Sequence, residues 1–139
     1  MIRLDKAEFN KETGISTVTI RTPLGKFTGH AKVHPEDVPY ASNITGCRYA
    51  DQRAKIKYLK AKARVISNEI KALNDFKNVL TSLENVYVSE TDIAFNYLCK
   101  QIEIKNRERQ TILERIGHIK ESIQMSIAAA DAMHKNGQN

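Results

Sequence analysis

Apolar and polar residues alternate along the first third of the chain, the pattern of β-strands with one buried face. Ser16, Val18 and Ile20 fall on one side of the clearest alternation and are mostly β-branched or small. Gly14 and Gly25 stand in the intervening turns, where positive φ is expected. The pattern predicts an antiparallel three-stranded meander within residues 1–46, with strands at residues 2–9, 15–21 and 27–33.

Farther along, apolar residues recur at alternating spacings of three and four, the pattern of amphipathic helices. The first helix is predicted over residues 47–83, with an apolar seam at Ile56, Leu59, Ala63, Ile66, Ile70, Leu73 and Leu80, and Lys77 as its polar break. The second is predicted over residues 89–134, with a seam at Phe95, Leu98, Ile102, Lys105, Arg109, Ile112, Ile116, Ile119, Ile123, Ser126 and Ala130. The short connection implies an antiparallel helical hairpin. Residues 135–139 are predicted to be a frayed tail.

These elements predict an α+β fold, a small N-terminal antiparallel three-stranded sheet packed on a long antiparallel two-helix hairpin. The chain has 139 residues, 41% of them hydrophobic, which suits a single domain over residues 1–139 with a modest core. Two helices and one small sheet leave part of the apolar seam uncovered. We therefore expect a homo-oligomer, a dimer or a hexamer.

Composition excludes several classes of protein. No apolar run approaches the ~20 residues that span a bilayer, and no signal-peptide pattern opens the chain. Cys47 and Cys99 have no metal-ligand spacing and are interpreted as buried free thiols. We expect a soluble protein of the cytoplasm with no membrane contact.

The net charge of +6 is concentrated in one segment. Residues 48–64 carry seven cations and one anion, so the rest of the chain is neutral in sum. Such a segment suits an anionic partner, nucleic acid included, through phosphate contacts. A solvated helix surface is the alternative interpretation, because the lysines spread around the helix.

Lys105 and Arg109 are the strongest candidates for a binding site. They lie one helical turn apart on an otherwise apolar seam, where unpaired cations are costly. They are expected to hold a phosphate or pyrophosphate, for which arginine supplies a fork and lysine a point charge. Alternatively, the helix rotates there, or a carboxylate such as Glu103 or Glu108 pairs with them.

Other motifs carry less chemistry. Lys26 follows Gly25 in a turn, but the full phosphate-binding loop pattern is missing, so an exposed turn lysine is the alternative. The HPED segment at residues 34–37 is expected to turn the chain out of the sheet. Neither a paired-histidine motif nor a nucleophile motif is present. The sequence therefore predicts no enzyme, no metal and no cofactor.

Several stretches together resemble a known family. GISTVTIRTPLGKFTGHAKVHPED (residues 14–37), NITGCRYADQRAKIKYLKAK (residues 43–62) and the two long helices are similar to the phage Thoeris anti-defence family. The resemblance implies a sponge without enzymatic activity in the infected bacterial host. Such a protein sequesters cyclic ADP-ribose isomers made by TIR-domain proteins, and in some members cyclic di- or trinucleotides.

The resemblance also implies site residues. The basic pair on the second helix, Lys105 with Arg109, matches the family's cyclic ADP-ribose pocket. An aromatic residue and an asparagine complete that pocket, with Phe95 or Tyr87, and Asn96, as candidates. A second anion site would use Lys26 with Arg48 or Arg53.

Two other functions compete with sequestration of a small nucleotide. One is a nucleic-acid-binding accessory protein acting through residues 48–64, whose affinity would depend on salt. The other is a coiled-coil adaptor with no ligand.

Overall fold

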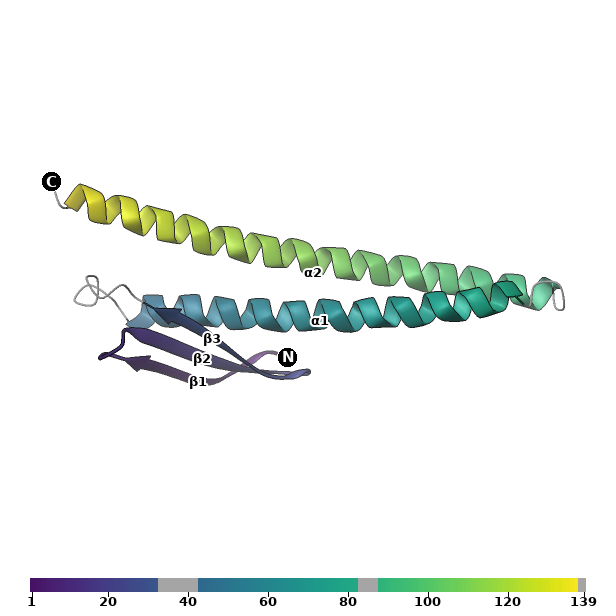
Figure 1. The fold of residues 1–139 in the computed structure, drawn as a ribbon, viewed down its shortest axis with the longest axis horizontal. Helices are drawn as coiled ribbons and strands as arrows, with labels where there is room; N and C mark the ends of the chain where they lie inside the picture. The colour runs from purple at the N-terminus through teal and green to yellow at the C-terminus, as the bar shows by residue number, and fades with distance from the viewer. Residues whose placement is uncertain (33–42, 83–87, 138–139) are drawn as a thin grey trace. The chain divides into compact units, whose positions relative to one another are not determined.

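The structure is a computed structural model that describes residues 1–32, 43–82 and 88–137. Three strands precede two helices (Figure 1): β1 (Arg3–Asn10), β2 (Ile15–Thr22), β3 (Gly25–Lys32), α1 (Asn43–Ser82) and α2 (Val88–Gly137). The sheet is antiparallel in the order β1-β2-β3. The predicted α+β class, with its three-stranded sheet and helical hairpin, is confirmed. The HPED segment lies outside the described residues.

The chain divides into two compact units that share both helices. The sheet unit is Met1–Ala61 with Arg115–Asn139, and the helix-pair unit is Lys62–Glu114. Each is described here by itself. The prediction of a single domain over residues 1–139 stays a prediction.

Turn chemistry fixes the register of the sheet. Asn10 accepts backbone hydrogen bonds from the turn that follows β1, among them Gly14 N to Asn10 O at 2.8 Å, and Gly14 has the predicted positive φ of 71°. In the second turn, Thr22 Oγ1 donates to Gly25 O at 2.7 Å and accepts from Leu24 N at 3.2 Å. Gly25 has φ 114°, a conformation that favours glycine.

One face of the sheet packs on the first half of α1, as Figure 1 shows. Val18 and Ile20 of β2 are 1% exposed and Ser16 is completely buried, so the face that these three residues share is the buried one. Ala50 and Ala54, one turn apart on α1, are completely buried. Since both side chains are small, the helix backbone comes into direct contact with Gly29 of β3. This close approach holds the sheet and the first half of α1 together.

α1 begins earlier, and α2 ends later, than the sequence predicted. α1 begins at Asn43, not at residue 47, so Gly46 lies within the helix. A Cβ at Gly46 would lie 2.2 Å from Ser16 Oγ, so a larger residue would have to displace the buried Ser16 side chain. α2 continues to Gly137, and residues 135–137 of the predicted tail are helical.

The predicted seams contain most of the buried residues of the two helices. Ile56, Leu59, Ala63 and Ile66 are buried on α1. The buried positions of α2 are Leu98, Ile112, Ile116 and Ile123. Toward the end of α1 the seam is only half-buried, at Ile70, Leu73 and Leu80. Within the described helices, no stretch is both long and apolar enough to cross a membrane.

Candidate functional site

Lys105 forms an ion pair across the two helices of the helix-pair unit. Its Nζ atom lies 2.7 Å from Glu69 Oε2 on α1 and 3.9 Å from Glu108 on its own helix. The contact with Glu69 raises the pKa of the Lys105 ammonium above its ordinary value of 10.5; desolvation opposes this rise, and the charges of Glu69 and Glu108 reinforce it. Lys105 is therefore a cation whose place on the seam is explained by an internal carboxylate.

Arg109 lies one turn farther along α2 and is exposed to solvent. The expectation that the seam buries both cations is thus wrong for Arg109 and correct only in part for Lys105, whose side chain is 32% exposed. Glu103, one of the carboxylates considered as a partner, pairs instead with Arg107. An exposed guanidinium near a half-buried ammonium leaves this face of α2 able to receive an anion from solvent.

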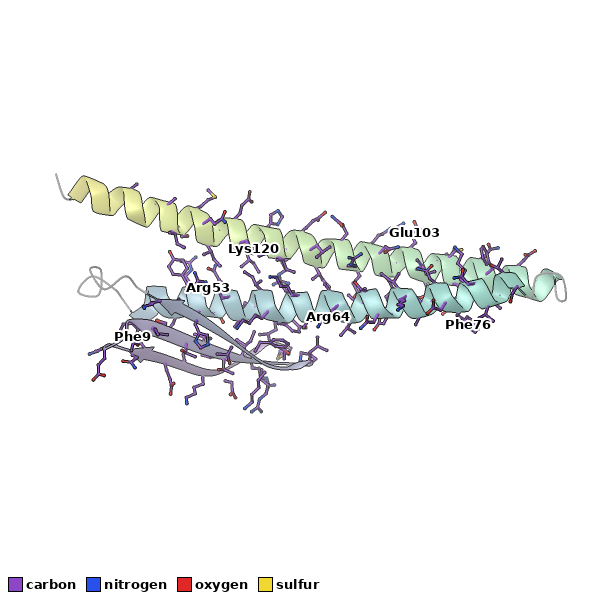
Figure 2. All side chains as sticks on the ribbon, viewed as in Figure 1. Phe9, Arg53, Arg64, Phe76, Glu103 and Lys120 are labelled. Carbon is purple, nitrogen blue, oxygen red and sulfur yellow. The ribbon has the colours of Figure 1, made fainter. Side chains whose placement is uncertain are left out.

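An open groove lies beside Lys105 in the helix-pair unit. Its volume is about 450 Å³, within the usual range for small-molecule sites, and its walls are mostly apolar. Two aromatic rings are prominent, since Phe76 is 54% and Tyr97 62% exposed; Phe76 is labelled on α1 in Figure 2. The groove is lined by Glu69, Ala72, Leu73, Phe76, Tyr97, Gln101 and Lys105.

The other candidates for the same pocket have separate positions. Phe95 is half-buried, with Lys77 Nζ 5.1 Å from its ring centroid, a cation–π contact that also explains the polar break in the α1 seam. Asn96 is exposed on α2. Tyr87 lies outside the described residues. None of these three lines the groove, so their assignment to a ligand stays a prediction.

Lys26 is held by a carboxylate of the sheet. Asp5 accepts from Arg21 Nη2 at 3.2 Å and lies 3.3 Å from Lys26 Nζ. The register shift between Leu4 and Lys6 marks a β-bulge at Asp5. Because Arg21 and Lys26 are cross-strand partners, the bulge supplies one carboxylate to two facing cations. The outcome is an exposed ion-pair cluster at the β2–β3 turn.

The basic segment at residues 48–64 is partly committed to contacts within the sheet unit. Arg53 Nη1 donates to the His30 carbonyl at 2.7 Å, and Lys55 pairs with Asp51 at 2.8 Å. Lys26 lies four residues from His30, about 13 Å along β3, so Lys26 and Arg53 engage different parts of the strand. Arg48 is exposed on α1. The proposed second anion site is therefore spread along β3.

Sequence reasoning identified Lys105 but missed the aromatic and amide residues that line the groove. Phe76, Tyr97 and Gln101 all lie off the predicted seams, which is why the heptad pattern gave them no role. The available signal was the pair of large aromatic residues next to seam positions, which widens the apolar face beyond what two helices cover.

Cys47 and Cys99 are free and half-buried, not fully buried as predicted. Across residues 1–32, 43–82 and 88–137, no group of three or more His, Cys, Asp or Glu side chains is arranged to hold a metal ion. Comparison with protein families, with curated proteins and with solved structures finds no match for this chain.

Proposed function

We propose that this protein binds and sequesters a small anionic nucleotide in the groove beside Lys105. The observation that carries the proposal is the combination of two exposed aromatic rings with an amide and a cation in one groove. Aromatic faces stack on nucleobases, amides hydrogen-bond their edges, and cations hold phosphates. Tyr97, Gln101 and Lys105 supply these three groups from one helix.

Cyclic ADP-ribose isomers are the ligands to test first, because the chain resembles phage Thoeris anti-defence proteins. In this proposal the protein withholds the signal from anti-phage defence in the bacterial host cytoplasm and does not turn it over. Cyclic di- and trinucleotides are the second group of ligands to test.

Glu69 sets a condition on the proposed binding. Its carboxylate is 2.7 Å from Lys105 Nζ, so a phosphate that reaches Lys105 competes with it for the same ammonium group. Arg109, exposed and one turn away, assists because it keeps its charge available. Glu69→Gln removes the competing charge while keeping the side-chain shape, and it is expected to tighten nucleotide binding.

The protein is also proposed to act as a homo-oligomer. Ile93, Tyr97 and Ile104 are more than half exposed, and their spacings of four and seven place them on one side of α2. Such a stripe suits a second copy of the chain. Because Tyr97 belongs both to the stripe and to the groove, assembly would enclose the ligand.

Calorimetric titration with a cyclic ADP-ribose isomer tests the proposal. Lys105→Gln with Arg109→Gln is expected to weaken binding by about two to four orders of magnitude, since each charge-assisted hydrogen bond is worth roughly 1.5–3 kcal/mol. Arg115→Gln with Lys120→Gln removes the same charge from exposed positions of α2 outside the groove and should bind normally. Unchanged affinity in the folded first variant, or equal loss in both, would reject the site.

Release of the ligand separates a sponge from an enzyme. Incubation with the isomer followed by heat denaturation should return the molecule intact by mass spectrometry. Recovery of a cleaved product would place the protein among enzymes and end the proposal of sequestration.

A further inference from the structure

Two basic side chains of α1 contact the outer edge of β3. Among the described residues, β3 is an edge strand of the sheet, and the outward carbonyls of its alternate residues have no partner strand. Lys57 Nζ donates to the Thr28 carbonyl and Arg53 Nη1 to the His30 carbonyl, each at 2.7 Å. Both basic side chains are nevertheless exposed. Figure 2 labels Arg53 where α1 runs beside the sheet.

The same edge presents backbone donors. In an antiparallel strand, the N–H and C=O groups of one residue point to the same side. Since the carbonyls of Thr28 and His30 face outward, their amide groups do so too. The Thr19 and Thr28 hydroxyl oxygens, 2.9 Å apart, fit the close side-chain spacing of a cross-strand pair without backbone hydrogen bonds. The edge is thus a row of hydrogen-bond donors.

Lys32 extends this row toward the end of β3. It is exposed, and because it lies two residues after His30 and four after Thr28, its backbone amide faces the same side of the strand as theirs. We name the surface formed by Lys32, Arg53, Lys57 and the outward amides of Thr28 and His30 the β3 strip.

Nearby carboxylates are engaged with other cations. Asp51 pairs with Lys55 at 2.8 Å, and Glu8, in the cross-strand row of His30, pairs with Lys6 at 2.9 Å. Asp5 is bound to the cations at the β2–β3 turn. Among residues 1–32, 43–82 and 88–137, these carboxylates leave the cations of the β3 strip without an ion-pair partner.

We propose that the β3 strip binds the phosphate backbone of single-stranded nucleic acid. The donors follow a straight row with a period of about 6.6 Å for every second residue of a strand, and Arg53 and Lys57 repeat at about one helical turn, 5.4 Å. A flexible single strand can follow such a row, whereas the phosphates of a duplex curve away from it. The donors of the row are cationic side chains and backbone amides, which contact phosphates, so the binding is independent of base sequence.

This surface is separate from the groove beside Lys105 and acts on a different ligand. A purely structural role for Arg53 and Lys57, protection of the sheet edge from pairing with another strand, is the competing explanation. It predicts that no nucleic acid binds at moderate salt.

Fluorescence anisotropy with the full chain separates the two explanations. The probe is a labelled oligothymidylate of about 20 nucleotides, longer than the ~4–16 nucleotides that one small domain covers. The affinity of the wild-type protein is expected to fall as salt rises from about 50 to 200 mM. Lys32→Gln with Lys57→Gln should reduce the slope of log K against log salt by about 1.4 and weaken binding at least about tenfold at 100 mM salt, as the loss of two single-strand phosphate contacts requires.

The matched control is Lys100→Gln with Lys120→Gln, which removes the same charge from exposed positions of α2. It should change binding little. Lys32→Glu alone, which alters no contact of the edge carbonyls, should also weaken binding and guards against a folding defect in the double variant. Absence of wild-type binding, equal loss in the control, or tighter binding to the matching duplex would overturn the proposal. Neither strip variant should change the affinity for a cyclic nucleotide in calorimetric titration. Loss of nucleic-acid binding at the β3 strip can therefore be told apart from loss of nucleotide binding beside Lys105.

Discussion

The carbonyl oxygen of Ala50 stands 2.0 Å from the position that a Cβ atom would occupy on Gly29, and the amide nitrogen of Ala54 stands at 2.5 Å. Both are backbone atoms of α1, so no side-chain rotation can make room for a methyl group. Gly29 is therefore the residue that lets α1 lie directly on β3.

Gly29→Ala is expected to destabilise the protein. Overpacking in a close-packed site costs about 1–3 kcal/mol, and displacement of α1 would in addition break the contacts of Arg53 and Lys57 with the β3 carbonyls. Urea denaturation followed by circular dichroism measures the change in the free energy of unfolding.

Gly117→Ala is the matched control for that experiment. Gly117 is an exposed helical residue of α2 whose Cβ would meet nothing within 4 Å. Alanine is the better helix former by about 0.8–1.0 kcal/mol, so this variant should be slightly more stable. Equal effects of the two substitutions would contradict the proposed role of Gly29.

The ion pair of Lys105 and Glu69 predicts a pH-dependent stability. The pKa of Lys105 is raised in the folded state, so the pair stabilises the fold fully below the ordinary value of 10.5 and loses this contribution as the pH rises through the raised pKa. Glu69→Gln should lower the free energy of unfolding at neutral pH. The difference from wild type should shrink in the alkaline range, as measured by urea titrations on both sides of the lysine pKa.

Glu103→Gln provides the comparison, because Glu103 pairs with Arg107. Arginine keeps its proton to above about pH 12, so any effect of this variant should stay constant over the same range. A parallel loss in both variants would show that global alkaline unfolding, not the Lys105 proton, is being measured.

The sequence was sufficient for the elements but not for every contact between them. Alternation in residues 15–21 and the two glycine turns identified the sheet, because each rests on local geometry. The start of α1 was wrong because Gly46 has the chemistry of a loop residue, while its actual role is contact with Ser16. A glycine that makes room for another element leaves no local signal.

Within the candidate site, the sequence predicted only the polar residues that interrupt the apolar seams. Lys77 and Lys105 were recognised as breaks in apolar seams, and each meets a partner on the other helix, Phe95 and Glu69. Periodicity locates such residues on a face but cannot name the residue opposite, which depends on the register of the two helices. For the same reason the cations of residues 53 and 57 gave no hint that they reach the edge of β3.

Tyr97 is expected to carry much of the affinity for a nucleotide in the groove. Stacking of a base on an aromatic ring is worth about 1–3 kcal/mol, so Tyr97→Ala should weaken binding of a cyclic ADP-ribose isomer by about one to two orders of magnitude. Tyr97→Phe keeps the ring and should retain most of the affinity. Leu113→Ala, a change at an exposed apolar residue outside both the groove and the stripe, should leave the titration unchanged.

Assembly through the exposed stripe on α2 gives the last prediction. Ile93 is 73% and Ile104 53% exposed, and eleven positions separate them, so they share one side of the helix. Light scattering of the wild-type protein should give a multiple of the 15.8 kDa chain mass. Ile93→Glu with Ile104→Glu places charges in the proposed interface and should dissociate the assembly while the chain stays helical. Leu113→Glu is the control, since Leu113 is 42% exposed and nine positions from Ile104, on the opposite side of α2. A wild-type monomer at micromolar concentration, or dissociation by the control as readily as by the stripe variant, would remove this surface as the interface.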